Sequence, residues 1–272
     1  MGLVSRVDHL SVHATPSSAT PSVRSRGRHG LTGAVLAVQA RLKGLLKPLV
    51  FRDEVVARTV RFGIGRGLVF HLNRRHELQK ELGLWEVEAQ AVYARCVGPG
   101  STVYDVGAAD GDSALLLARL AAPGEVVAFE PDAGLRARLM ENARLNPTVP
   151  NPRVVPAFVG ARAGNGTTTL DAVAAAGSVP PPKFIKIDVD GGELAVLEGA
   201  RRLLRDYRPA VFVEVHGLDR ERACREFLAA RGYAVQVIPN AWWRAIYPEH
   251  RLPVVHNRWL LAVPGDSRNK VA

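Results

Sequence analysis

The sequence predicts a wound α/β fold, in which strands and helices alternate along the chain. Stretches rich in Val, Ile and Phe alternate with helical stretches beyond residue 100, as in a mostly parallel sheet with helices on both faces. The first strand-like stretch runs into a turn of small residues and then an apolar helix, at 102–120, which is how such folds open. Later strand-like stretches also end in an acidic residue, as Glu130 and Asp188 illustrate.

The first part of the chain has a different composition. Residues 1–32 are rich in Ser, Pro, Arg and His without a hydrophobic period, which indicates a disordered basic tail. We expect a helical N-terminal extension over 33–97, the main domain over 98–264 and a C-terminal tail over 265–272. Residues 1–50 carry seven Lys/Arg and one Asp, and residues 51–84 carry seven Lys/Arg and four Asp/Glu, so most of the net charge of +10 precedes residue 85. The main domain is nearly neutral, and we expect no nucleic-acid partner.

No apolar run reaches the roughly 20 residues that a membrane helix needs. The amphipathic pattern of residues 33–47 is compatible with peripheral membrane contact, and a helix packed on the main domain is the alternative. Cys96 and Cys224 lie far apart in the sequence without metal-ligand spacing, which favours free thiols in a reducing compartment. We therefore expect a cytoplasmic protein.

The turn after the first strand is suited to a ligand. Small residues at Gly107, Ala108 and Ala109 allow a ligand to lie against the backbone, and Gly111 permits torsions that a side chain would forbid. The following helix begins near Ser113, so its unpaired N–H groups point to the same place. A tight turn with no ligand is the alternative.

The acids of this turn favour one class of cofactor. A dinucleotide fingerprint has the spacing G-x-G-x-x-G, whereas this turn has a different glycine pattern and carries Asp105, Asp110 and Asp112. Three carboxylates would repel a pyrophosphate and suit a ligand with an ammonium or sulfonium group. The sequence therefore favours S-adenosylmethionine over a nicotinamide dinucleotide.

The remaining elements follow in order. Glu130 ends a second strand about 20 residues beyond Gly111, a position suited to hydrogen bonds with ribose hydroxyls; capping of the next helix is the alternative. Trp85 and Glu86, just before a helix over 87–96, are hypothetical ligand contacts. We expect further strands at 153–159, 183–188, 209–215, 233–238 and 259–263, helices at 133–146, 194–206 and 219–231, and a substrate-side insertion at 239–258.

Five motifs together resemble the FkbM-type S-adenosylmethionine-dependent methyltransferase family. The resemblance covers about residues 62–264, and its most specific motif is IDVxGxE followed by LxGA. The chain departs from the family's usual pattern at Ala109 (commonly Asn), Asp190 (commonly Glu) and Gly192 (commonly Ala). The five motifs are YDVGAADGDS (104–113), VVAFEPD (126–132), TLD (169–171), FIKIDVDGGELAVLEGA (184–200) and PAVFVEVHG (209–217).

The resemblance implies a class I methyltransferase fold, with a Rossmann-like, mostly parallel sheet of seven strands whose last strand is antiparallel. It also implies methyl transfer to a hydroxyl group, typically on a sugar or another small natural-product acceptor. S-adenosylmethionine would lie over the ends of the first two strands. The expected cofactor-binding residues are Asp105, Gly107, Ala108, Ala109, Asp110, Gly111, Ser113, Glu130, Pro131 and Asp188.

The catalytic candidates lie after the fourth and fifth strands, where an alcohol acceptor would have to lose its proton. His216 is the candidate general base, since the ordinary imidazole pKa lies near neutrality; a histidine that caps or bonds the neighbouring loop is the alternative. Asp188 and Glu214 are the other candidates, and they could instead hold a divalent cation such as Mg²⁺. Glu193 could act only on its helix N-terminus.

Two further classes of function stay open at this point. A nucleotide-cofactor oxidoreductase would bind NAD(P)H and not S-adenosylmethionine. A non-catalytic binding protein could use the basic N-terminal part, or could be a methyltransferase fold that has lost activity, which Ala109 makes conceivable.

Overall fold

The computed structural model describes residues 50–239 and 258–265, all within the unit Leu45–Ala272. The predicted basic tail, the amphipathic segment 33–47 and nearly all of the predicted insertion lie outside the described residues. Within the described part of the chain, no helix has both the length and the apolarity needed to cross a membrane. Cys96 and Cys224 are both free thiols.

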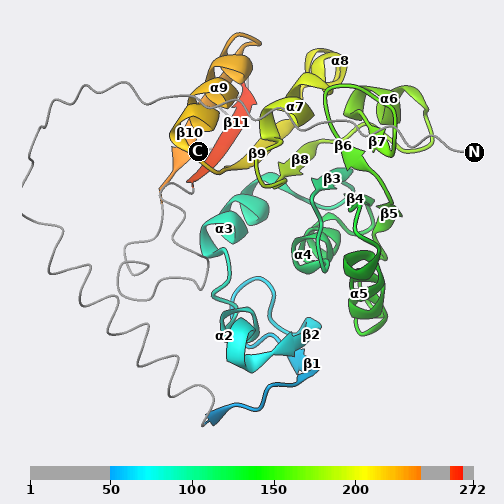
Figure 1. The fold of residues 1–272 in the computed structure, drawn as a ribbon, viewed down its shortest axis with the longest axis vertical. Coiled ribbons are helices and arrows are strands. Elements are labelled where there is room, and N and C mark those ends of the chain that lie inside the picture. Colours follow the sequence, from blue (N-terminus) through cyan, green and yellow to red (C-terminus); the bar gives the residue numbers. More distant parts are fainter. Residues whose placement is uncertain (1–49, 240–257, 266–272) are drawn as a thin grey trace, which may run out of the picture. The chain divides into compact units, whose positions relative to one another are not determined.

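Strands in the order β10-β11-β9-β8-β3-β4-β5 form a central seven-stranded sheet (Figure 1). From β5 to β9 neighbouring strands pair in parallel, whereas β11 pairs antiparallel with both β9 and β10. This topology confirms the expected class I methyltransferase fold. The strands are β3 (Val103–Val106), β4 (Val126–Phe129), β5 (Arg153–Val155), β8 (Phe184–Ile187), β9 (Ala210–Val215), β10 (Tyr233–Ile238) and β11 (Arg258–Pro264).

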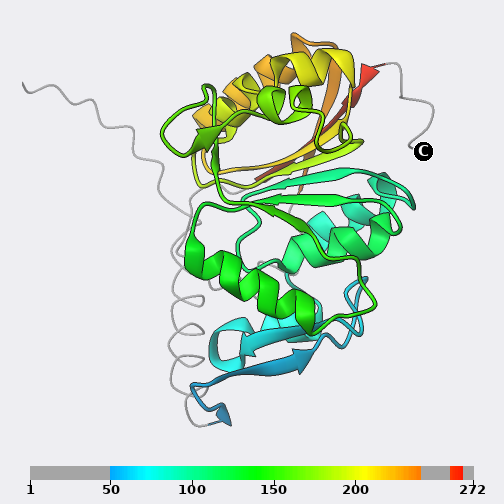
Figure 2. The same ribbon diagram turned by 90° about the vertical axis from the view of Figure 1, so that its right-hand side faces the viewer.

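Helices cover both faces of the sheet (Figure 2). One face packs against α3 (Val87–Cys96), α4 (Asp112–Ala121) and α5 (Ala133–Arg144). The other packs against α6 (Leu170–Ala175), α7 (Glu193–Glu198), α8 (Arg201–Asp206) and α9 (Leu218–Ala229). Each face has its own buried apolar cluster, because successive side chains of a strand point to opposite faces.

This alternation places three charged side chains on one face of the sheet. Val103 and Phe184 pack in the cluster beneath α3 and α4, so Asp105 and Lys186, two residues further along the same strands, point to that face as well. They are direct neighbours in the parallel register of β3 and β8. Phe212 of β9 packs in the same cluster, which brings Glu214 to this face too.

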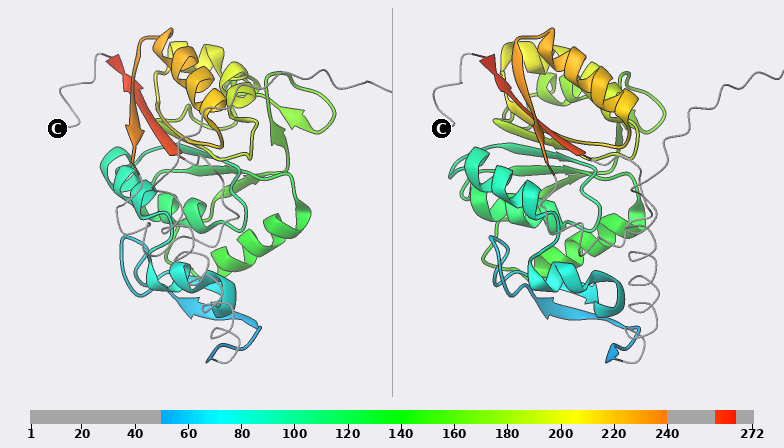
Figure 3. Two further views of the ribbon diagram at one scale, coloured as in Figure 1. Left: turned by 60° about the vertical axis from the view of Figure 1, so that its left-hand side comes forward. Right: turned by 90° about the vertical axis from the view of Figure 1, so that its left-hand side faces the viewer.

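The N-terminal extension differs from the helical prediction. Residues 55–73 contain an antiparallel pair, β1 (Val55–Thr59) and β2 (Val69–Asn73), ahead of α2 (Arg74–Leu82) and α3. Alternating burial along β2 shows the strand period, which the glycine-rich connection obscured in the sequence. Figure 3 shows this hairpin on the side of the sheet away from α9.

Two other predicted elements are divided. The third strand ends at Val155, and β6 (Phe158–Val159) pairs with β7 (Thr167–Thr168) outside the main sheet. Pro156, which has no N–H to donate, separates the two parts. The helix expected over 194–206 is split into α7 and α8 near Gly199, where a Cβ would overlap the carbonyl oxygen of Gly160.

Two buried asparagines attach the hairpin to the main domain. The Asn146 side chain accepts from the N–H of Val69 and donates to its carbonyl, at 2.9 and 2.7 Å. Asn142 accepts from the N–H of His71 at 2.9 Å and donates to the carbonyl of Asp110 at 2.9 Å. Asn142 therefore connects β2 to the turn that follows β3.

Asn142→Ala removes both of these connections and leaves buried backbone groups without partners. We expect a loss of about 2–4 kcal/mol in the free energy of unfolding, measured by chemical denaturation. Asn151 is exposed, so Asn151→Ala is the matched control, with an expected change within about 0.5 kcal/mol. Equal stability of the two variants would contradict the attachment role of Asn142.

Candidate active site

The turn after β3 is shaped by backbone torsions that its residues make possible. Gly107 has a φ of +83°, and a Cβ there would overlap the carbonyl oxygen of Asp188. Gly111 has a φ of +88°, and a Cβ would lie 2.7 Å from Cγ of Leu139. Ala109 also has a positive φ, +47°, a conformation in which Asn is more common than Ala. The turn therefore passes directly against the end of β8.

Asp105 lies beneath this turn and does not reach its surface. Its side chain is fully buried; Oδ2 accepts a 2.7 Å hydrogen bond from the Ser113 hydroxyl, and Oδ1 lies 3.4 Å from Nζ of Lys186. Burial raises the pKa of Asp105, against the effect of Lys186. Burial would lower the pKa of Lys186, but the carboxylates of Asp105 and Asp188 raise it well above its ordinary value. Both groups therefore serve to hold the turn.

The other two acids of the turn are paired with a lysine from α2. Nζ of Lys80 lies 3.2 Å from Asp110 and 3.2 Å from Asp112. Burial opposes the charge on Lys80, but the carboxylates raise its pKa. The three acids thus have lysine partners, which differs from the expectation that they would face a cationic ligand unpaired. The spacing of the acids could not reveal this, because both lysines come from other elements.

Glu130, at the end of β4, connects the turn to the next helix. Its Oε2 accepts from the N–H of Ala109 at 2.9 Å, and its Oε1 accepts from the N–H of Asp132 at 2.8 Å. Each carboxylate oxygen has a second lone pair, so these bonds leave capacity for ribose hydroxyls. Asp132 caps α5 by accepting from the N–H of Leu135. Ala108 is buried, whereas Pro131 is only half-buried beside Glu130.

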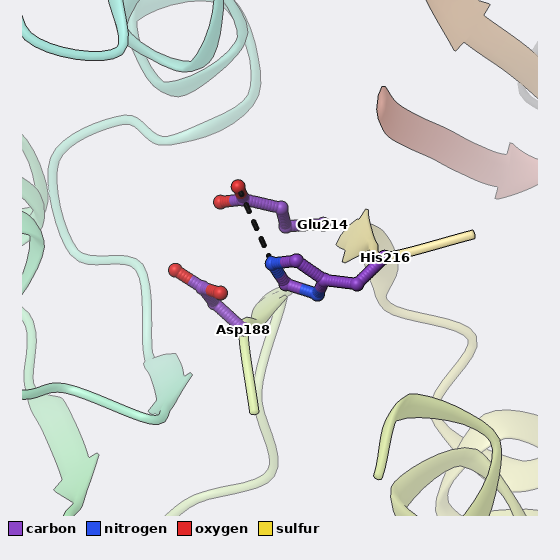
Figure 4. Close-up of side chains that lie close together, drawn as sticks. All are labelled: Asp188, Glu214 and His216. Atoms are coloured by element: carbon purple, nitrogen blue, oxygen red, sulfur yellow. Dashed lines mark ion pairs between the residues drawn. The ribbon is translucent and has the colours of Figure 1, made fainter. Parts of the chain in front are cut away.

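Asp188, Glu214 and His216 converge beyond the ends of β8 and β9 (Figure 4). Each offers one atom that could bind a metal ion, and these atoms all lie within 4.8 Å of one another. Nε2 of His216 is 3.7 Å from Oε1 of Glu214. The structure therefore brings together the three residues named as catalytic candidates. Asp188 in turn adjoins Gly107, so the cluster borders the turn.

A fourth residue, Glu193 of α7, fixes the imidazole ring. Its Oε1 lies 2.9 Å from Nδ1 of His216 and also accepts from the N–H of Gly191 at 2.8 Å. The hydrogen bond to Glu193 raises the pKa of His216, with burial opposing and the carboxylates of Glu214 and Asp188 adding to the rise. Burial opposes the charge of Glu193, but its hydrogen bonds lower its pKa. The neutral ring then carries its proton on Nδ1 and leaves Nε2 as an acceptor.

The side chains of this cluster are also of the kinds that bind metal ions. Two carboxylates and one imidazole can hold a divalent cation, although Mg²⁺ prefers oxygen ligands alone. Lys186 places its ammonium group 3.5 Å from Oδ2 of Asp188, and this positive charge would oppose a cation there. The arrangement suits proton transfer by His216 better than it suits Mg²⁺.

Sequence analysis missed two charged side chains that pair with the acids of the candidate site, Lys80 and Lys186. Lys186 had a signal, because it interrupts the buried strand FIKI on the face shared with Asp105. Lys80 had none, since its partners are contributed by the turn about 30 residues later. Trp85 and Glu86, hypothetical contacts from the sequence, line a cavity together with Lys80, Asp112 and Ser113.

Comparisons with known proteins give a family match in the same part of the chain. Residues 165–235 match the model of the methyltransferase FkbM domain, a segment that carries Asp188, Glu193, Glu214 and His216. No curated protein sequence matches the chain.

Several solved structures are similar to this chain at low sequence identity. Methyltransferase FkbM from Methylobacillus flagellatus KT is 20% identical with a TM-score of 0.47, covering 60% of this chain and 43% of that one. Precorrin-6y C5,15-methyltransferase from Geobacter metallireducens GS-15 is 17% identical, with a TM-score of 0.47, 65% of this chain and 88% of that one. Fibrillarin from Aeropyrum pernix, with natively bound S-adenosyl-L-methionine, is 17% identical, with a TM-score of 0.46. The match covers 64% of this chain and 74% of that one.

The segment that matches the methyltransferase FkbM domain contains three of the five motifs quoted from the sequence, TLD, FIKIDVDGGELAVLEGA and PAVFVEVHG. Over residues 165–235 the chain is therefore similar to the FkbM methyltransferases.

Proposed function

We propose that this enzyme transfers the methyl group of S-adenosylmethionine to a hydroxyl group of a small acceptor, such as a sugar or another natural product. The observation that carries the proposal is the state of His216. Its Nδ1 is held by Glu193 at 2.9 Å, and its Nε2 is left to accept a proton beside Asp188 and the cofactor turn. A base in this position is what an alcohol acceptor needs.

The transfer is an in-line displacement. The acceptor oxygen forms a bond to the methyl carbon while the bond from that carbon to sulfur breaks, and the electron pair stays on the sulfur of S-adenosylhomocysteine. The hydroxyl proton passes to Nε2 of His216. Glu214 lies 3.7 Å from this nitrogen, so its negative charge stabilises the imidazolium that forms.

The cofactor is bound by backbone more than by the acids of the turn. The small residues 107–111 would let the methionine part lie on the chain, and Glu130 and Pro131 would meet the ribose. Three contacts keep the turn in this conformation. Asp110 pairs with Lys80, and Asp105 pairs with Lys186 and accepts a hydrogen bond from Ser113. Asp188 lies between the turn and His216, where the sulfonium would come closest to the acceptor.

Glu130→Gln tests the cofactor site. The amide keeps one acceptor oxygen for the backbone but cannot accept from both ribose hydroxyls as the carboxylate can. We expect the Kd for S-adenosylmethionine to rise about tenfold or more in calorimetry.

Incubation with labelled S-adenosylmethionine and a panel of glycosides and polyketides should give a product heavier by one methyl group, and less of it with the variant. Glu141→Gln, on the exposed side of α5, is the matched control and should leave the Kd unchanged. Tight binding of NAD(P)H in place of S-adenosylmethionine would contradict the proposal.

The pH dependence of kcat/KM tests the base. A protonated His216 cannot accept the hydroxyl proton, so the rate should rise with pH, with a midpoint above 6.5, the ordinary value from which the pKa of His216 is raised. Glu193→Gln removes the charged partner that causes the rise. The midpoint should therefore move to lower pH, while the maximal rate falls because the ring loses its fixed tautomer.

Asp190→Asn is the control for this shift. Its carboxylate lies 3.5 Å from Nε2 of His216, but its side chain is 97% exposed, so water and salt screen its charge. We expect little change in the midpoint. An unchanged midpoint in Glu193→Gln would contradict the role of Glu193, and loss of activity with a chelator, restored by Mg²⁺, would assign proton removal to a metal ion.

A further inference from the structure

The N-terminal extension and the start of α4 enclose a cavity next to the cofactor turn. Its polar lining comes from both parts of the chain, with Lys80, Glu86 and Tyr93 on one side and Asp112 and Ser113 on the other. The Trp85 indole also lines it, with Nζ of Lys80 at 5.4 Å from the centre of the ring. Ser113, which lines the cavity, also donates a hydrogen bond to Asp105 beneath the turn. One residue therefore belongs both to the cavity lining and to the contacts that hold the turn.

One polar group in the lining has no partner. The Tyr93 side chain is 2% exposed, and its hydroxyl makes no hydrogen bond to any described residue. The ring itself is fixed, since it packs edge-on against Phe184 and Phe212 at centroid distances of 6.0 and 5.7 Å. A buried hydroxyl without a partner is costly, so a ligand group that bonds it would be bound favourably.

The lining carries charges of both signs. Lys80 supplies an ammonium group, and Glu86 and Asp112 supply carboxylates. Glu86 is 7% exposed and has a φ of +45°, an unfavourable conformation for a residue with a side chain. Gln90 maintains it by donating to the carbonyl oxygens of Gly83 and Trp85 at 3.2 and 2.7 Å. Such backbone strain often occurs at ligand sites.

The cavity is small and lies beside the turn. The space inside measures about 50 Å³. Its lining offers a hydroxyl and charged groups of both signs, which are partners for the ammonium and the carboxylate of an amino-acid end group.

We propose that this cavity takes the amino-acid end of the cofactor, with Glu86 facing the ammonium group and the Tyr93 hydroxyl donating to the carboxylate. The inference rests on the proposed S-adenosylmethionine site and adds residues from outside the matched family segment. The extension would thus complete the cofactor site and would not merely cover it.

Two ligands separate the amino-acid end from the rest of the cofactor. S-adenosylhomocysteine carries this end, and 5′-methylthioadenosine has the same adenosine and thioether without it. In calorimetry with the full chain, Tyr93→Phe and Glu86→Gln should each weaken S-adenosylhomocysteine about tenfold while 5′-methylthioadenosine changes less than about twofold. Unchanged binding of the second ligand also shows that each variant is folded.

Tyr104→Phe is the matched control, because the Tyr104 hydroxyl is bonded to the carbonyl of Pro180 in the other core. It should change the affinity for neither ligand. Equal weakening of both ligands by Tyr93→Phe and Glu86→Gln, or weakening of neither, overturns the assignment of the cavity and leaves the proposed function standing. Failure of the wild-type protein to bind either ligand overturns both.

Discussion

The buried ion pair between Asp105 and Lys186 is the contact on which the site depends. The two residues are neighbours in the register of β3 and β8, and their charged atoms lie 3.4 Å apart with no exposure of Asp105. Either charge alone would be very unfavourable there. Together they fix the turn through Ser113 and hold Asp188 beside it. The strand β3, which ends in this turn, is thereby linked to β8, which leads to Asp188 and its cluster with Glu214 and His216.

Two contacts of polar side chains link the N-terminal extension to the same turn. Lys80 reaches from α2 to Asp110 and Asp112, while Asn142 connects β2 to the carbonyl of Asp110. Both contacts meet at residues next to the helix N-terminus of α4. The extension is therefore part of the structure that shapes the proposed cofactor site, and the cavity lined by Glu86 lies where the two parts meet.

Much of the fold and of the site could be predicted from the sequence. The strand ending at Asp105, the turn and the helix after it all form as expected, because local hydrophobic period and turn residues specify them. The convergence of Asp188, Glu214 and His216 was also predictable, since parallel strands deliver their ends to one edge of a sheet. The β1–β2 hairpin was not, because its short strands carry few alternating positions and a glycine-rich connection.

The sequence by itself determined the fold class, the turn and the family to which the motifs point. Only the tertiary structure decided how the charges combine. From the sequence, Asp110 and Asp112 were expected to be unpaired carboxylates, but the fold brings Lys80 of α2 to both of them. The sequence likewise indicated no partner for His216, and the fold brings Glu193 of α7 to its ring. The physical reason is that local structure follows from neighbouring residues, whereas the state of a buried charge depends on groups that folding brings from elsewhere in the chain.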